Sequence, residues 1–276
     1  RGLDVRVLLP GMPAILNGVL DLKRVIRFGP AFGAAVITLR LGRLPDSGLL
    51  AYVIDAPFLY RRDGNPYLGP DGCDWSDNHR RFALLGWIAA HLAAGELDRH
   101  WQPDVVHAHD WHAGLAPAYI AQNPAGTTAT VFTIHNLSFR GLFPLDHHND
   151  LGLQISGANQ SGVEFHGQLS FMKAALVHAK RVNAVSPTYA REICTAEFGW
   201  GLDGVLRGRG GDLSGILNGV DYSVWDASTN AALPRNYSAE RLRGKLVCKL
   251  GLQKQLGFAL RARTPLFAIV SRLTSQ

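Results

Sequence analysis

The chain has 276 residues, of which 47% are hydrophobic, and a formal net charge of +6. This composition excludes an intrinsically disordered chain and predicts one large domain with part of another. The positive charge favours an anionic partner. The basic residues are scattered, however, and lack the interleaved aromatic side chains on which bases stack, so nucleic acid is not the expected partner.

Two other classes of protein are excluded on similar grounds. The cysteines Cys73, Cys194 and Cys248 lie far apart, which predicts neither a disulfide framework nor a Cys-x-x-Cys zinc site and fits a reducing, cytoplasmic location. The longest apolar stretch, Phe82–Gly95, is shorter than the roughly 20 residues that a membrane-spanning helix needs. We therefore expect no membrane partner, and nothing in the sequence indicates an oligomeric state.

Short apolar runs alternate with helical stretches along the chain, as in an α/β protein with a mostly parallel sheet. The expected strands are Val5–Leu9, Ala35–Leu39, Ala51–Ile54, Asp104–Ala108, Thr130–Thr133, Arg181–Val185, Gly215–Leu217 and Leu266–Val270. The expected helices are Asn78–Ala94, Gly114–Gln122, Gln168–Ala179 and Pro187–Glu197, the last with Ser186 as its N-cap. The Gly- and Arg-rich stretch Leu206–Asp212 predicts a linker or surface loop before a second domain.

Ligands of open α/β sheets gather beyond the carboxyl ends of the strands. Three segments follow expected strands in this way: His107-Ala-His-Asp-Trp-His112, Thr133-Ile-His-Asn136 and Ala184-Val-Ser-Pro187. We expect the candidate site among them.

The first segment permits a zinc-hydrolase reading through His107, His109, Asp110 and His112, because His-x-His at a strand end can supply metal ligands. The spacing argues against it, since the metallo-β-lactamase pattern is His-x-His-x-Asp-His and here Asp110 follows His109 directly. The alternative is that His107 and His109 bond backbone groups near the sheet, after a buried run at Asp104–Val106.

Asp110 and His135 are the sharper candidates. A carboxylate that ends a strand can accept a sugar hydroxyl, although Asp110 could equally be the N-cap of the following helix. His135 and Asn136 precede an irregular stretch and could line the same cleft, and a non-catalytic, hydrogen-bonded His135 remains the alternative.

The sequence has neither a Gly-x-Gly-x-x-Gly fingerprint nor a P-loop. It has a short turn, Leu217-Asn-Gly-Val-Asp221, and an arginine, Arg272, at the end of the last expected strand. An arginine placed there can bind a diphosphate bidentately without a metal, or it can be an ordinary surface charge.

Taken together and in order, these segments resemble the bacterial glycogen synthase (starch synthase) family. The matching pieces are Arg6-Val-Leu-Leu-Pro10, Ile54-Asp-Ala-Pro57, Asn65-Pro-Tyr67, Arg81-Phe-Ala-Leu-Leu-Gly-Trp87, the run from Pro103 to Pro117, Thr133-Ile-His-Asn136, Val185-Ser-Pro-Thr-Tyr-Ala-Arg-Glu192, Leu217-Asn-Gly-Val-Asp221 and Val270-Ser-Arg-Leu-Thr-Ser-Gln276. A related transferase that uses UDP-glucose or makes sucrose is not expected to share the His-Ala-His-Asp-Trp-His-Ala-Gly-Leu-Ala-Pro run.

The resemblance implies a glycosyltransferase B fold of two facing Rossmann-like domains. Residues 1–210 are then the acceptor-side domain, and 211–276 begin the nucleotide-sugar-binding domain. It also implies retaining transfer of glucose from ADP-glucose to an α-1,4-glucan such as glycogen, with no metal or separate cofactor.

The resemblance further implies roles for single residues. Asp110 and His135 are expected to act on the donor glucose, and Arg272 on the donor phosphates. The substrate-binding positions that match are Tyr67, His112, Asn136 and Asn218.

Compared with the family pattern, the sequence is expected to be shortened at both ends. The Lys-Thr-Gly-Gly-Leu loop is missing before Arg1, and the lysine and essential glutamate of the family would follow Gln276. The chain alone is therefore expected to be inactive and marginally stable, with strands after residue 210 left exposed. A catalytically silent glucan-binding module is the non-enzymatic alternative.

Overall fold

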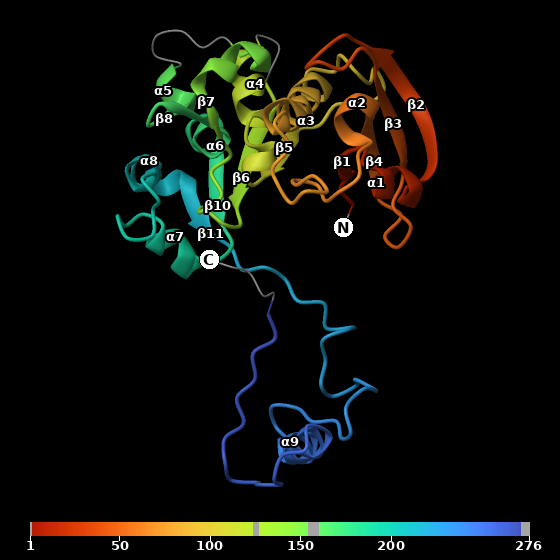
Figure 1. Cartoon of the computed structure of the whole chain (residues 1–276), viewed down its shortest axis with the longest axis vertical. Coiled ribbons are helices and arrows are strands. Elements are labelled where there is room, and N and C mark those ends of the chain that lie inside the picture. Colours follow the sequence, from red (N-terminus) through yellow and green to blue (C-terminus); the bar gives the residue numbers. More distant parts are fainter. Residues whose placement is uncertain (1, 124–126, 154–159, 272–276) are drawn as a thin grey trace. The chain divides into compact units, whose positions relative to one another are not determined.

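The computed structural model describes residues 2–123, 127–153 and 160–271. The chain divides into two compact units, Arg1–Leu217 and Asn218–Gln276. Every strand of the described residues lies in the first unit, so the sheets that position the candidate site belong to that unit alone (Figure 1).

The first sheet is mixed. Its order is β1-β4-β3-β2, where β1 and β4 are parallel and the other pairs antiparallel. Its strands are β1 (Arg6–Pro10), β2 (Leu20–Phe28), β3 (Ile37–Arg43) and β4 (Leu50–Asp55). Strand β2 was not predicted from the sequence, because this edge strand is largely exposed, carries four charged residues and is irregular in its pairing with β3. The prediction of a mostly parallel sheet is therefore wrong for this first sheet.

The second sheet is parallel throughout, in the order β11-β10-β6-β5. Its strands are β5 (Val105–His109), β6 (Ala129–Ile134), β10 (Arg181–Ala184) and β11 (Leu213–Gly215). β5 is an edge strand, and Val105 is 52% exposed, so the expected burial of the run before His107 is wrong. Because all four strands are parallel, their carboxyl ends meet at one edge of this sheet.

A small antiparallel sheet follows, formed by β7 (Leu142–Pro144), β8 (Glu164–Phe165) and β9 (Gln168–Ser170). β9 occupies the first residues of the helix predicted over Gln168–Ala179, and α6 extends only over Phe171–His178. The helix begins late because Ser170 is its N-cap, with Oγ accepting a hydrogen bond from the Lys173 amide at 3.1 Å.

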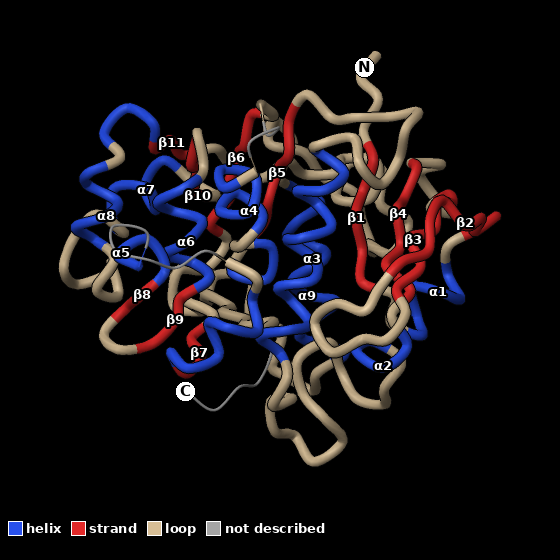
Figure 2. Tube along the Cα trace, turned by 90° about the horizontal axis from the view of Figure 1, so that it is seen from above, coloured by secondary structure: helices blue, strands red, loops and turns tan. Residues whose placement is uncertain are grey.

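Helix α3 (Asn78–Ala93) packs against both halves of the first unit (Figure 2). One face, with Leu84 and Ile88, joins the core of the first sheet, and another, with Phe82 and Ala90, joins a core with α4 (Ala116–Gln122) and α6. A Cβ at Gly86 would lie 2.8 Å from the Ala116 amide nitrogen, so glycine is required where α3 crosses the start of α4. A helix that is apolar on most of its surface is expected between two cores.

The stretch predicted as a linker is ordered secondary structure. Helix α8 (Asp203–Gly208) and the 3-10 turn η4 (Gly210–Asp212) lead into β11, which pairs with β10. Helix α7 (Pro187–Glu192) is shorter than predicted, and its N-cap is confirmed, since Ser186 Oγ accepts from the Tyr189 amide at 2.9 Å. The remaining short elements of the unit are α1 (Pro13–Gly18), α2 (Pro57–Tyr60), η1 (Trp111–Ala113), η2 (Leu145–Leu151) and α5 (Gln160–Val163).

In the second unit the described residues form one helix, α9 (Arg243–Gln255), and no strand. The predicted strand Leu266–Val270 is therefore wrong. Phe267, Ile269 and Val270 are 90–100% exposed. A strand forms only where a neighbour satisfies its backbone groups, and no described residue pairs with this segment. No helix in the described part of the chain is both long and apolar enough to cross a bilayer.

Candidate functional site

The carboxyl ends of β5 and β6 bring Asp110 and His135 together. His109 is the register partner of Thr133, and the Asp110 amide continues the pairing by donating to the Thr133 carbonyl at 3.0 Å. The Asp110 carboxylate then turns to the neighbouring strand, where Oδ1 accepts from the His135 amide at 2.8 Å. Asp110 stands at the N-cap position of η1, but its side chain makes no capping bond there, so the side-chain role expected of an N-cap is not found.

Asp110 has a left-handed backbone, with φ of 52° and ψ of −179°. This region is nearly restricted to glycine, and a residue with a side chain pays about 1–3 kcal/mol to occupy it. The conformation directs the carboxylate toward β6 and away from the helix that follows. Strain of this kind is concentrated at functional sites, which makes Asp110 a strong candidate.

The histidines at the strand ends form hydrogen bonds with one another and with nearby side chains. The backbone partners expected for His107 and His109 are not found among the described residues. His109 Nδ1 lies 3.0 Å from His135 Nε2, and His107 Nε2 lies 2.6 Å from Thr133 Oγ1. Thr133 Oγ1 donates to Asn183 Oδ1 at 2.7 Å, so it must accept from His107, which therefore carries its proton on Nε2. Partial removal from water lowers the pKa of His107 and of His109, and repulsion between the protonated rings adds to this effect.

The loop after β6 is held at three of its backbone amides, those of His135, Leu137 and Ser138. Asp110 binds the His135 amide, Tyr189 Oη accepts from the Leu137 amide at 2.9 Å, and Asn136 Oδ1 accepts from the amide and hydroxyl of Ser138 at 3.0 and 2.7 Å. Tyr189 comes from α7. The exposed side chains of His135 and Asn136 are thus presented on a loop that two other elements fix.

Tyr67 and His112 form an aromatic wall of the same unit. Their ring centroids lie 5.0 Å apart, and His112 also contacts the rings of Phe82 and Trp111 at 5.1 and 4.1 Å. Tyr67 is 43% exposed, so one side of its ring faces solvent. An exposed ring of this kind offers an apolar surface beside the polar groups of the strand ends.

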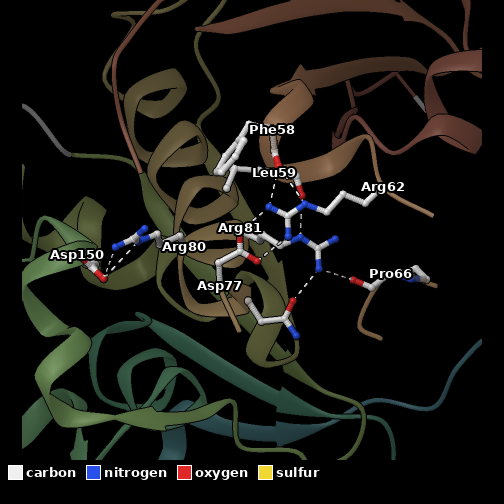
Figure 3. A network of polar contacts seen from close by, with 9 residues as sticks. Phe58, Leu59, Arg62, Pro66, Asp77, Arg80, Arg81 and Asp150 are labelled. Atoms are coloured by element: carbon white, nitrogen blue, oxygen red, sulfur yellow. Dashed lines mark hydrogen bonds and ion pairs between the residues drawn. The ribbon is translucent and has the colours of Figure 1, made fainter. Parts of the chain in front are cut away.

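The loop that carries Tyr67 is fixed by a buried arginine at the start of α3 (Figure 3). Arg81 is 2% exposed and donates to the carbonyls of Leu59 at 2.9 Å and Pro66 at 3.1 Å. It also donates to Asn78 Oδ1 at 2.6 Å, and Asn78 in turn donates to the Tyr67 carbonyl at 3.0 Å. Its own carbonyl accepts from the Tyr60 hydroxyl at 2.6 Å. The guanidinium thus ties both α2 and the Tyr67 loop to α3.

Burial of His112 gives a testable pH dependence. Removal from water lowers the pKa of His112 to about 4 from an ordinary value near 6.5, so the folded protein keeps this ring neutral. Between these two pH values the unfolded chain binds more protons, and the free energy of unfolding falls as the pH falls. We expect His112→Gln to flatten this slope in urea titrations between about pH 7 and pH 4.5. An unchanged slope would show that His112 is accessible to protons in the folded state.

Two predicted site residues are not among the described residues of the first unit. Asn218 begins the second unit and is exposed, and Arg272 lies outside the described residues. The site described here consists of Asp110, His135 and Asn136 with the aromatic pair Tyr67 and His112.

The zinc alternative is not supported by the geometry. His107, His109, Asp110 and His112 do not converge on one point, and the single converging group among the described residues is His79, His147 and Asp150. There the two imidazoles are stacked 4.0 Å apart at 14°, so their in-plane lone pairs do not meet. Asp150 Oδ2 is already paired with Arg80 Nη2 at 2.9 Å (Figure 3). These contacts describe an ion pair that fixes η2 on α3.

Comparison with known proteins decides the family. A sequence model of the starch synthase catalytic domain matches residues 1–208. The chain belongs to the starch synthase catalytic domain family. Proteins named glycogen synthase match it over its whole length, at 54% identity in Variovorax paradoxus, 52% in Serratia proteamaculans and 47% in Francisella tularensis subsp. novicida. The chain spans 57% of the length of each of these three relatives.

The fold of this starch synthase family member agrees with a solved relative. The catalytic domain of starch synthase IV from Arabidopsis thaliana, bound to ADP and acarbose, matches with a TM-score of 0.71 at 26% identity, over 94% of this chain and 53% of that chain. The glycosyltransferase B fold expected from the resemblance is thereby confirmed. The parallel order β11-β10-β6-β5 is the Rossmann-like part of it in the first unit.

The residues that support the site were not predicted from the sequence. Thr133, Asn183, Tyr189 and Arg81 all lie inside segments that were noted for other reasons, as strand, helix or family motif. Thr133 and Asn183 carry a usable signal, because each is a polar residue inside an apolar strand run. Arg81 and Tyr189 carry no such signal, because Arg81 stands beside Arg80 ahead of the apolar run and Tyr189 lies in a polar segment.

Proposed function

We propose that the protein to which this chain belongs is a glycogen or starch synthase. It transfers glucose from ADP-glucose to the non-reducing end of an α-1,4-glucan, with retention of the anomeric configuration. Family membership supports this class of reaction. The observation that carries it here is Asp110, a strained carboxylate at a strand end that fixes His135 beside it.

In the proposed mechanism Asp110 acts with its second oxygen. Oδ1 is occupied by the His135 amide, whereas Oδ2 has no hydrogen-bond partner among the described residues and is free to accept a donor-sugar hydroxyl. The His135 side chain is held by the contact of its Nε2 with His109 and lies against the glucosyl group. There it stabilises the positive charge that develops on the sugar ring. No carboxylate is assigned as a covalent nucleophile, so transfer proceeds by front-face attack within an ion pair.

The other contacts are assigned to substrate binding. Tyr67 and His112 supply an aromatic surface, and Asn136 supplies an exposed amide. Asn218 and Arg272 are assigned to the donor, with Arg272 on the diphosphate in place of a metal ion. Residues 211–276 are accordingly proposed as the beginning of the nucleotide-sugar-binding domain, although β11 and the residues up to Leu217 pack with the first unit.

We place this activity in the cytoplasm, where ADP-glucose and glycogen are the partners. The support is the three free cysteines, Cys73, Cys194 and Cys248, which suit a reducing compartment.

The test is transfer of labelled glucose onto glycogen by a polypeptide that contains this chain within the full length of its relatives. Incorporation from ADP-glucose, well above that from UDP-glucose and unchanged by chelator, is expected. Preference for UDP-glucose would overturn the proposed donor. Loss of activity with chelator would restore a metal-dependent reading, and no incorporation by a folded protein would leave only glucan binding.

A further inference from the structure

A hollow of about 310 Å³ lies on the first sheet, on the side covered by α1, and shares no residue with the site described above. Its walls are Pro13, Leu16 and Asn17 of α1, Leu22 of β2, Arg40 of β3, Asp55 of β4 and Arg61 after α2. The volume is at the lower end of the range found for small-molecule sites.

The polar part of this hollow is a carboxylate clamped by two guanidinium groups. Asp55 is 4% exposed, Arg40 Nε lies 2.9 Å from its Oδ2, and Arg61 Nη2 lies 2.8 Å from its Oδ1. Each guanidinium uses one nitrogen for this bond, and no other hydrogen bond of either group is made to the described residues. The remaining N–H groups of both arginines are therefore available to a ligand.

The local charge is positive. Two arginines on one aspartate leave a net charge of +1, and Arg24 adds a third cation because it is the register partner of Arg40 and projects from the same face of the sheet. No aromatic ring is among the residues that line the hollow, so the surface on which a neutral sugar normally stacks is missing. Fixed guanidinium groups with free N–H donors are instead the arrangement that binds phosphate oxygens.

We propose that this hollow, at Arg40, Arg61 and Asp55, is a second binding site, for the phosphoryl group of a small phosphorylated metabolite. Asp55 holds the two guanidinium groups in place and tempers their charge. The apolar side chains of Leu16 and Leu22 face the remainder of the ligand. The site is independent of the proposed transfer reaction, and its test requires no transfer activity.

The test is isothermal titration calorimetry with inorganic phosphate, ribose 5-phosphate and neutral ribose. We expect saturable binding of ribose 5-phosphate that is tighter than that of phosphate, and none of ribose. Equal affinity for both phosphates would show that free phosphate is the ligand and overturn the metabolite part of the proposal. Binding of ribose alone, or no saturable binding of either phosphate, would overturn the site.

Three variants test whether the observed binding takes place in this hollow. Arg61→Gln is expected to weaken ribose 5-phosphate binding by about tenfold or more, because a charge-assisted bond is lost. Arg61 is half exposed, so this variant is expected to fold normally. Arg43→Gln, on the same sheet but outside the lining, is the control and is expected to bind as the parent does.

Asp55→Asn is the most discriminating variant, because its expected effect on ribose 5-phosphate affinity is opposite in sign to that of Arg61→Gln. The asparagine keeps an amide oxygen that can accept from one of the two guanidinium groups, and removal of the negative charge is expected to tighten binding of the anion by several-fold. A site that recognised sugar hydroxyls would instead lose its acceptor and bind less well. Weaker binding in Asp55→Asn, or unaltered binding in Arg61→Gln, would contradict the proposal.

Discussion

Asp110→Ala is expected to lower glucosyl transfer by at least about a hundredfold, which is the loss seen when one preorganised polar group is removed from a transition-state site. The carboxylate has two tasks, since Oδ1 fixes the His135 amide and Oδ2 is assigned to the sugar. Both are lost in the variant. The measurement is incorporation of labelled glucose from ADP-glucose by the protein at the length of its relatives.

Asp110→Gly is the matched control, because it removes the same carboxylate but relieves the backbone strain at φ 52°. Asp110→Gly is expected to be as inactive as Asp110→Ala, and its free energy of unfolding is expected to be about 1 kcal/mol higher than that of Asp110→Ala. If the two variants differed in activity in parallel with their stability, the loss would reflect folding and not chemistry. Near-normal transfer in both would remove Asp110 from the mechanism.

Arg81→Ala is expected to lower the free energy of unfolding by about 3 kcal/mol. The guanidinium is fully buried and bonds two carbonyls and one amide oxygen, so truncation leaves all three acceptors unsatisfied and opens a cavity. Urea denaturation of the chain followed by circular dichroism measures the effect.

Arg43→Ala serves as the control for Arg81→Ala, because Arg43 is exposed and makes a single bond to the Gly48 carbonyl at 3.3 Å. A change within about 0.5 kcal/mol is expected there. A similarly small change in Arg81→Ala would show that water replaces the buried bonds, and the Tyr67 loop would then not depend on this network.

The parts of the fold that sequence analysis predicted best are those with strong periodicity. Helix α3 begins at the predicted residue, Asn78, because its apolar face is continuous and it is buried between two cores. β2 was missed because charged residues interrupt its alternation at the edge of a sheet. Leu266–Val270 has the composition of a strand but no pairing partner among the described residues, and composition cannot supply one.

The candidate site was predictable in position but not in detail. The carboxyl ends of parallel strands meet, so the approach of Asp110 to His135 followed from two strand assignments. The hydrogen bond that the Asp110 carboxylate accepts from the His135 amide depends on the positive φ of Asp110, which no local sequence pattern predicts. The contact between Tyr67 and His112 depends on Arg81, whose hydrogen bonds link segments far apart in the sequence.

The most direct test of the account is a crystal structure of the protein, at the length of its relatives, with ADP and a maltooligosaccharide bound. We predict a glucose unit within hydrogen-bonding distance of Asp110 Oδ2 and His135, with Tyr67 and His112 beside it. A sugar bound elsewhere on the first unit, with Asp110 and His135 contacting only protein atoms, would contradict the account.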